Sequence, residues 1–168
     1  MHCSRIFVAV VGLLTAIGTA MPSTTVSARE LEVTAKLVGP DPVHGTPACD
    51  PAGRCVLTVA GAAEVTGDLV GGTANAGALM FNSATNTYLT MQYTLFTGTI
   101  AGCGTGTMLL RSPEVRGSQR PFSGKIEVIL GTGTADLRGV MGSGTYTVAK
   151  DGAVYVSVWS LRLHCPQR

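Results

Sequence analysis

Residues 87–100 read TYLTMQYTLFTGTI, and their side chains alternate between a mainly apolar and a mainly polar face with a period of two. One face carries Leu89, Met91, Tyr93 and Leu95, and the other carries Tyr88, Thr90, Gln92, Thr94 and Phe96. Alternation over this length, in a stretch rich in Thr, Tyr and Phe, is typical of a β-strand. Residues 101–104 then predict a Gly-rich tight turn, and residues 105–111 predict the returning strand of an antiparallel hairpin.

Similar stretches follow one another along most of the chain. The expected strands cover residues 30–37, 56–69, 73–81, 87–100, 105–111, 122–130, 145–149 and 153–163, and the second of them is interrupted by Gly61 and Gly67. Residues 39–53 form a Pro- and Gly-rich loop, and Asp151-Gly152 predicts a hairpin turn. Short connections make consecutive strands antiparallel neighbours, and a closed barrel leaves no free edge. We therefore expect one all-β domain over residues 29–168, an eight-stranded antiparallel up-and-down barrel, with a β-sandwich as the alternative.

The composition and the net charge exclude two classes of protein, those that bind nucleic acid and those that are disordered. The chain has 168 residues, of which 22 are Gly and 13% are charged, and its formal net charge is +2. So little charge gives no field that would hold nucleic acid, and the apolar content is too high for a disordered chain. No cofactor is indicated.

The first 28 residues resemble a secretory signal peptide. A short start containing Arg5 precedes twelve residues, Ile6 to Ile17, that are apolar apart from Gly12 and Thr15, and small residues follow. As a helix those twelve residues extend only about 18 Å, too short for a membrane core of about 30 Å. We expect cleavage after Ala20 or Ala28, no integral membrane span after cleavage, and a secreted, periplasmic or envelope location.

Four cysteines stay after cleavage, because Cys3 leaves with the signal peptide. An even number in an exported chain predicts disulfides. Cys49 and Cys55 bracket Asp50-Pro51-Ala52-Gly53-Arg54, a sequence typical of a turn that brings the two sulfurs together, which leaves Cys103 to pair with Cys165. In an up-and-down barrel, Cys55 lies at one rim and both Cys103 and Cys165 lie at the other, which favours the same pairing. No metal site is expected, because no C-x₂₋₄-C spacing occurs.

Three Gly-rich segments carry a resemblance to a known family. Residues 131–146 read GTGTADLRGVMGSGTY, residues 65–71 read VTGDLVG, and residues 96–107 read FTGTIAGCGTGT. Taken in their order along the chain, they resemble segments of bacterial proteins with allene oxide cyclase barrel-like domains, including the DUF3224 proteins, which are distantly related in fold to plant dirigent proteins. The resemblance implies a calycin-like barrel with a central cavity, cyclase- or dirigent-like chemistry on apolar molecules, and assembly as a homo-oligomer. Within residues 131–146, Asp136 is expected to cap a helical turn whose Leu137 points inward.

Two sets of residues are candidates for function. Glu64 and Asp68 share a strand face; if that face pointed inward, burial would raise the carboxyl pKa and provide a general acid or base. An exterior, solvated face is the alternative. The aromatic side chains expected to line a cavity, or alternatively to fill the core, are Tyr88, Tyr93, Tyr146, Tyr155 and Trp159.

Three functions fit these expectations. The first is binding of a small apolar ligand or partner in or on the barrel, without catalysis. The second is a cyclase- or dirigent-like enzyme acting inside the barrel, and the third is a structural envelope module. A packed, dry interior would exclude the first two.

Overall fold

The computed structural model describes residues 28–82, 85, 87–112 and 122–167. The expected signal peptide, apart from Ala28, lies outside these residues. No helix among the described residues is long and apolar enough to span a membrane. The strands are β1 (Ala28–Pro40), β2 (Val43–His44), β3 (Ala48–Cys49), β4 (Arg54–Gly67), β5 (Leu69–Asn82), β6 (Thr87–Ile100), β7 (Gly104–Ser112), β8 (Phe122–Val128), β9 (Met141–Asp151) and β10 (Val154–Pro166).

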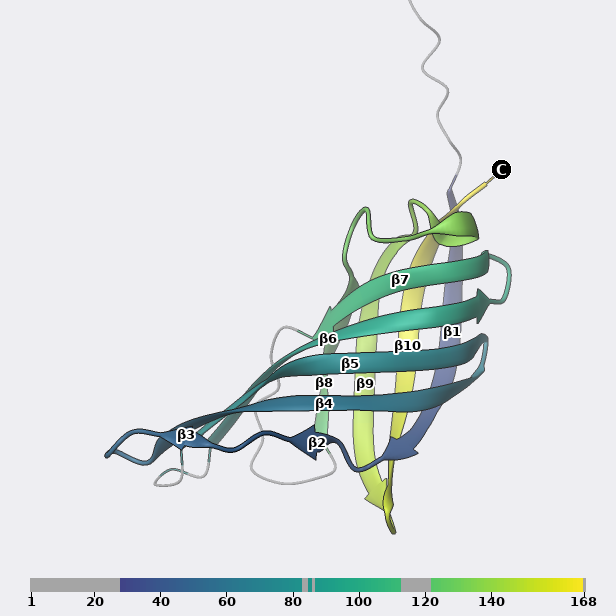
Figure 1. Cartoon of the computed structure of the whole chain (residues 1–168). Coiled ribbons are helices and arrows are strands. Elements are labelled where there is room, and N and C mark those ends of the chain that lie inside the picture. The colour runs from purple at the N-terminus through teal and green to yellow at the C-terminus, as the bar shows by residue number, and fades with distance from the viewer. Residues whose placement is uncertain (1–27, 83–84, 86, 113–121, 168) are drawn as a thin grey trace, which may run out of the picture.

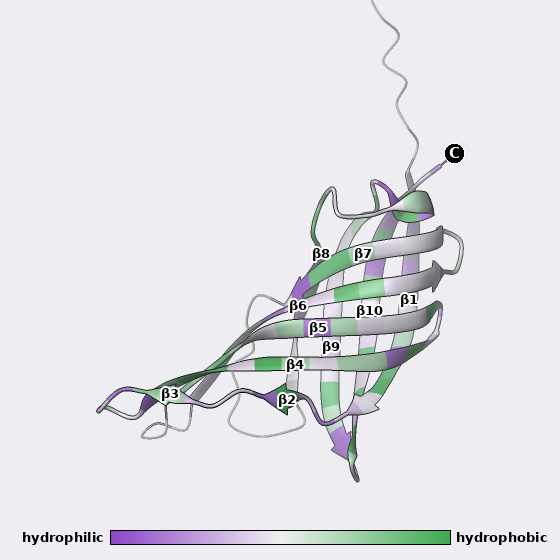
Figure 2. Cartoon of the chain, viewed as in Figure 1, coloured by the Kyte–Doolittle hydropathy of each residue, from purple (hydrophilic) through white to green (hydrophobic). Residues whose placement is uncertain are grey.

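Eight of these strands close into an antiparallel barrel, which confirms the predicted fold. Strands β4 to β10 pair in chain order, β10 pairs with β1, and β1 pairs with β4 to complete the circle. In Figure 1, β4–β7 cross the front of the barrel, while β1 and β8–β10 run behind them in a different direction. Hydrophobic segments and paler or hydrophilic segments follow one another along the strands (Figure 2).

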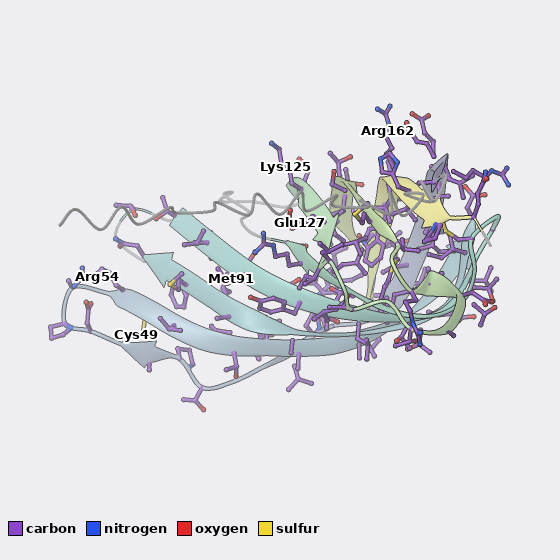
Figure 3. All side chains as sticks on the ribbon, turned by 90° about the horizontal axis from the view of Figure 1, so that it is seen from above. Cys49, Arg54, Met91, Lys125, Glu127 and Arg162 are labelled. Carbon is purple, nitrogen blue, oxygen red and sulfur yellow. A yellow bond between two sulfur atoms is a disulfide. The ribbon has the colours of Figure 1, made fainter. Side chains whose placement is uncertain are left out.

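The strands β4, β5 and β6 extend beyond the barrel as a curved arm (Figure 1). The Pro- and Gly-rich loop is more ordered than its sequence predicts, because β2 and β3 lie in it and both pair with β4. Cys49 and Cys55 face each other in this pairing and form a disulfide, which we call the tip disulfide. Figure 3 shows Cys49 and Arg54 at the outer end of the arm, far from Arg162 on the barrel wall.

The opposite end of the barrel is densely packed. Leu69, Phe96, Ile100 and Met108 are fully buried there. Leu137, which is also fully buried, comes from the single 3-10 turn in the described residues, η1 (Ala135–Leu137), which covers this end (Figure 1). Each such side chain contributes about 1.5–3 kcal/mol through its removal from water.

The Cys103–Cys165 disulfide ties two elements together beside this packed end. Cys103 lies in the turn between β6 and β7, and Cys165 lies near the end of β10. The two disulfides therefore have the predicted pairing and lie at opposite ends of the molecule.

Two local expectations were wrong. The strand expected over residues 56–69 continues through Gly61 without a break, but it ends at the second expected interruption: β4 ends at Gly67, whose φ of 110° suits glycine, and β5 begins at Leu69. Asp68 turns the chain and fixes it to β1: its N–H donates to the Thr34 carbonyl at 2.9 Å, and its carboxylate accepts from the Thr34 N–H at 2.8 Å. The alternation Val-Thr-Gly-Asp-Leu continues through this turn, so Gly67 rather than the periodicity is the sequence feature that marks it.

The second wrong expectation concerns the residue that caps η1. The helical turn and its buried Leu137 are present, but Thr134 occupies the N-cap position and Asp136 lies within the turn. The Asp136 carboxylate accepts a hydrogen bond from the Thr105 N–H at 3.1 Å instead. Asp136 therefore ties η1 to β7 rather than capping it.

Candidate functional site

A cavity of about 400 Å³ occupies the interior between the packed end and the arm. Small interior positions on β4 make room for it, since Gly61 and Ala63 lie where larger side chains would fill the space. A Cβ on Gly61 would come within 3.1 Å of the Asn75 side-chain oxygen, so the glycine leaves room for the carboxamide of Asn75. The interior is thus neither completely packed nor open at both ends.

One wall of the cavity consists of side chains from β1, β9 and β10, which are aromatic or aliphatic apart from one serine. We call this the aromatic wall and define it as Leu37, Tyr146, Val148, Tyr155, Ser157 and Trp159. Trp159 pairs with Tyr146 across β10 and β9, and the two side chains are 4% and 7% exposed. Tyr146 lies directly over Gly124 of β8, where a Cβ would approach the phenol oxygen to 2.8 Å.

Uncharged polar side chains from β5, β6 and β7 make the facing wall. We call this the polar wall and define it as Thr73, Asn75, Thr90, Gln92, Thr94 and Ser112. The strand register explains their grouping, because Asn75 pairs with Thr94 and Gln92 pairs with Ser112. Thr73 and Thr94 are each only 7% exposed, so hydroxyl and carboxamide groups are held inside the barrel.

Among the described residues that line the cavity, His44 is the one side chain that can carry a positive charge. No Asp, Glu, Lys or Arg among the described residues lines the cavity. Burial raises the pKa of Tyr146 above its ordinary value of 10.0, and a hydrogen bond with Ser112 opposes part of this shift. Because the pKa is raised, the Tyr146 phenol is neutral at neutral pH. The charged groups lie outside: Arg162 pairs with Glu32 at 2.8 Å and Glu30 at 3.2 Å across the outer face of β10 and β1.

An ion pair lies beside residues that line the cavity. Lys150, near the end of β9, bonds to Asp41 at 2.8 Å and lies 5.6 Å from the centre of the Tyr155 ring. Asp41 follows β1, and its neighbours Pro40 and Pro42 line the cavity. The Lys150–Asp41 ion pair therefore joins the segment between β1 and β2 to the β9–β10 hairpin.

The predicted aromatic residues divide between the two sides of the barrel wall. Tyr88, Tyr155 and Trp159 line the cavity, as does Tyr146. Tyr88 lies toward the arm, with its ring 6.2 Å from that of Phe81. Tyr93 lies on the exterior face with 43% exposure, because it follows the opposite alternation along β6.

The two candidate carboxylates lie on the outer surface. Glu64 is exposed on β4, and Asp68 is exposed in the β4–β5 turn, bonded to Thr34. Neither lines the cavity. Among the described residues, no group of His, Cys, Asp and Glu side chains is arranged to hold a metal ion.

The sequence interpretation did not select Asn75, Gln92 or Ser157. A usable indication existed for Gln92, which alternates with Phe96 on one face of the same strand. Once Phe96 is known to point inward, Gln92 and Thr94 must point inward too. Ser157 could have been found in the same way, because it lies between Tyr155 and Trp159 on one face of β10. Asn75 is flanked on its face by Thr73 and Gly77, so no large apolar neighbour marks that face.

Comparisons with known proteins agree with this architecture. Residues 47–158 match the family described as "Protein of unknown function (DUF3224)". A crystal structure of a DUF3224 protein of unknown function from Shewanella oneidensis MR-1 is similar in fold, with a TM-score of 0.61 and 16% identity. The similarity covers 83% of this chain and 99% of the other. No curated protein sequence matches the chain. Since the match spans most of the barrel, the chain belongs to the DUF3224 family.

Proposed function

We propose that the protein binds a small, uncharged, mainly apolar molecule inside its barrel, without catalysis. The observation that carries the proposal is the cavity of about 400 Å³ with the aromatic wall on one side. Cavities of about 300–1,000 Å³, lined by apolar and aromatic side chains with a few polar groups, are typical of small-molecule sites. A structural envelope module needs no such space.

The cyclase- or dirigent-like alternative needs a group that transfers protons or stabilises charge at a bound substrate. Its candidate acids, Glu64 and Asp68, are exposed, and Asp68 is bonded to Thr34. We therefore favour binding over catalysis. The predicted signal peptide and the two disulfides support the further proposal that binding takes place outside the cytoplasm.

The single tryptophan provides a direct test. Trp159 is the only tryptophan of the chain and lines the cavity, so its fluorescence responds to what enters. We expect the neutral dye N-phenyl-1-naphthylamine to bind one molecule per barrel, with a change in Trp159 emission and a rise in dye fluorescence. Absence of saturable binding by the folded protein would contradict the proposal.

Two serines of β10 give a matched pair of variants. Ser157 lines the cavity, whereas Ser160, three residues along, is exposed on the outer face. The substitution Ser157→Leu fills part of the cavity and should weaken dye binding about tenfold or more, while Ser160→Leu should leave it unchanged. Equal effects of the two substitutions would show that the dye binds elsewhere.

A further inference from the structure

The polar and aromatic walls face each other across the barrel, and this arrangement carries an inference about the ligand. Around the closed barrel, β6 and β10 are four strands apart in either direction, so they lie on opposite sides. The same count places β5 opposite β9. Asn75 and Gln92 therefore face the side from which Tyr146, Ser157 and Trp159 point inward.

The carboxamides of Asn75 and Gln92 give the polar wall its chemistry. Each carboxamide offers two N–H donors and one carbonyl acceptor within a few ångströms. Such a group is matched by a ligand edge that also presents a donor beside an acceptor. Asn75 and Gln92 lie on neighbouring strands, and the register sets Gln92 next to Ser112 and Asn75 next to Thr94.

Ser157 adds an independent indication on the opposite wall. Its hydroxyl is buried, lines the cavity, and has no hydrogen-bond partner among the described residues. In the strand register its neighbours are the apolar residues Leu37 and Val148. Because buried polar groups in proteins are nearly always hydrogen-bonded, a rotation about the Cα–Cβ bond that turns this shielded hydroxyl toward the cavity would let an entering polar group become its partner.

The charge of the ligand follows from the lining. A carboxylate or ammonium group moved into this cavity would lose its hydration and find no Asp, Glu, Lys or Arg among the described lining residues, and the His44 imidazole is the one lining group that can carry a positive charge. Neutral hydroxyl and carboxamide groups compensate only part of that loss. The cavity therefore discriminates against ions, even those with a suitable apolar body.

We propose that the ligand is an uncharged ring compound with a primary amide or lactam edge, which bonds to Asn75 and Gln92 while its ring packs on Tyr146 and Trp159. A second polar group on the far side of the ring would bond to Ser157. The inference rests on the proposed function, since it specifies the ligand class of the same cavity.

Three naphthalene probes of nearly equal size separate the relevant chemistry. They are 2-naphthamide, 2-methylnaphthalene and 2-naphthoate, titrated into the full protein at neutral pH and measured by calorimetry. We expect the amide to bind about tenfold more tightly than the hydrocarbon, and at least about a hundredfold more tightly than the carboxylate. Equal affinities for the amide and the hydrocarbon, or tight binding of the carboxylate, would overturn the inference.

Variants then locate the discrimination. The substitution Gln92→Met keeps the length of the side chain but removes its donors and acceptor. It should weaken amide binding about tenfold while changing hydrocarbon binding less than about twofold, so the hydrocarbon also reports that the cavity is intact. The control Thr97→Val changes an exposed residue of the same strand and should affect neither probe. Unchanged amide affinity in Gln92→Met would overturn the assignment of Gln92.

The outcomes for the two proposals are distinct. If hydrocarbon and dye bind but the amide has no advantage, the cavity is a binding site and only the polar-wall inference fails. If neither the dye nor any of the three naphthalene probes binds to the folded protein, the proposed function fails as well.

Discussion

Substitution of Gly124 by alanine should destabilise the protein through one specific contact. A Cβ at this position would lie 2.8 Å from the phenol oxygen of Tyr146 and 2.9 Å from two of its ring carbons. Ordinary contacts of a Cβ are 3.4 Å or longer, so the buried ring must move by at least half an ångström. Overpacking of this kind costs about 1–3 kcal/mol of unfolding free energy.

The contact is isolated by a double-mutant cycle. In a Tyr146→Leu background the phenol oxygen and the distal ring carbons are absent, so Gly124→Ala no longer meets them. There the substitution should be neutral, or stabilising by about 0.4–1 kcal/mol because alanine restricts the unfolded chain. The coupling energy between the two positions is therefore expected to be about 1–4 kcal/mol.

Urea unfolding followed by Trp159 fluorescence, with the disulfides intact, measures all four members of the cycle. Trp159 is suitable because it is buried beside Tyr146 in the native barrel. The same destabilisation by Gly124→Ala in both backgrounds would refute the reasoning, because the Tyr146 ring would then not be the group that the new methyl meets.

Three other perturbations test different parts of the fold. Leu137→Ala empties a fully buried position at the packed end and should cost about 2–5 kcal/mol in urea unfolding, whereas a loss below about 1 kcal/mol would show that η1 does not close the barrel. Replacing Cys103 and Cys165 by serine opens a 62-residue closure and should cost about 4 kcal/mol, against about 2 kcal/mol for the six-residue tip disulfide; the reverse order would contradict the unfolded-chain argument. The Asp50 carboxylate accepts hydrogen bonds from the Arg54 and Ala52 N–H groups and from the Arg54 side chain, which hold its pKa below the ordinary 3.8. The stabilisation is therefore present above pH 3.8 and is lost as the pH falls through the lowered pKa, and an NMR titration of Asp50 with a midpoint at or above 3.8 would contradict it.

Much of the fold follows from local rules that the sequence displays directly. The alternation over residues 87–100 predicts β6 with the bounds that the structure has. The disulfide pairing follows from turn chemistry at Asp50-Pro51 together with the side of the barrel on which each strand ends. The strand prediction and the disulfide prediction both depend only on backbone geometry. They therefore hold without knowledge of which side chains form the core.

The candidate site is less predictable, because alternation does not say which face is inside. On β6 the more apolar face, with Met91, Tyr93 and Leu95, lies outside and is more than 40% exposed. Gln92 and Thr94 on the other face line the cavity. A barrel that keeps an open interior does not need its most apolar face inward, so hydrophobicity misleads at the site itself.

The most direct test of the central claim is a crystal structure of the protein with 2-naphthamide bound. We expect density for the ring inside the barrel against Tyr146 and Trp159, with the amide within hydrogen-bond distance of Asn75 or Gln92. Density for the probe only on the outer face of the barrel, or an empty cavity at saturating probe, would contradict the account.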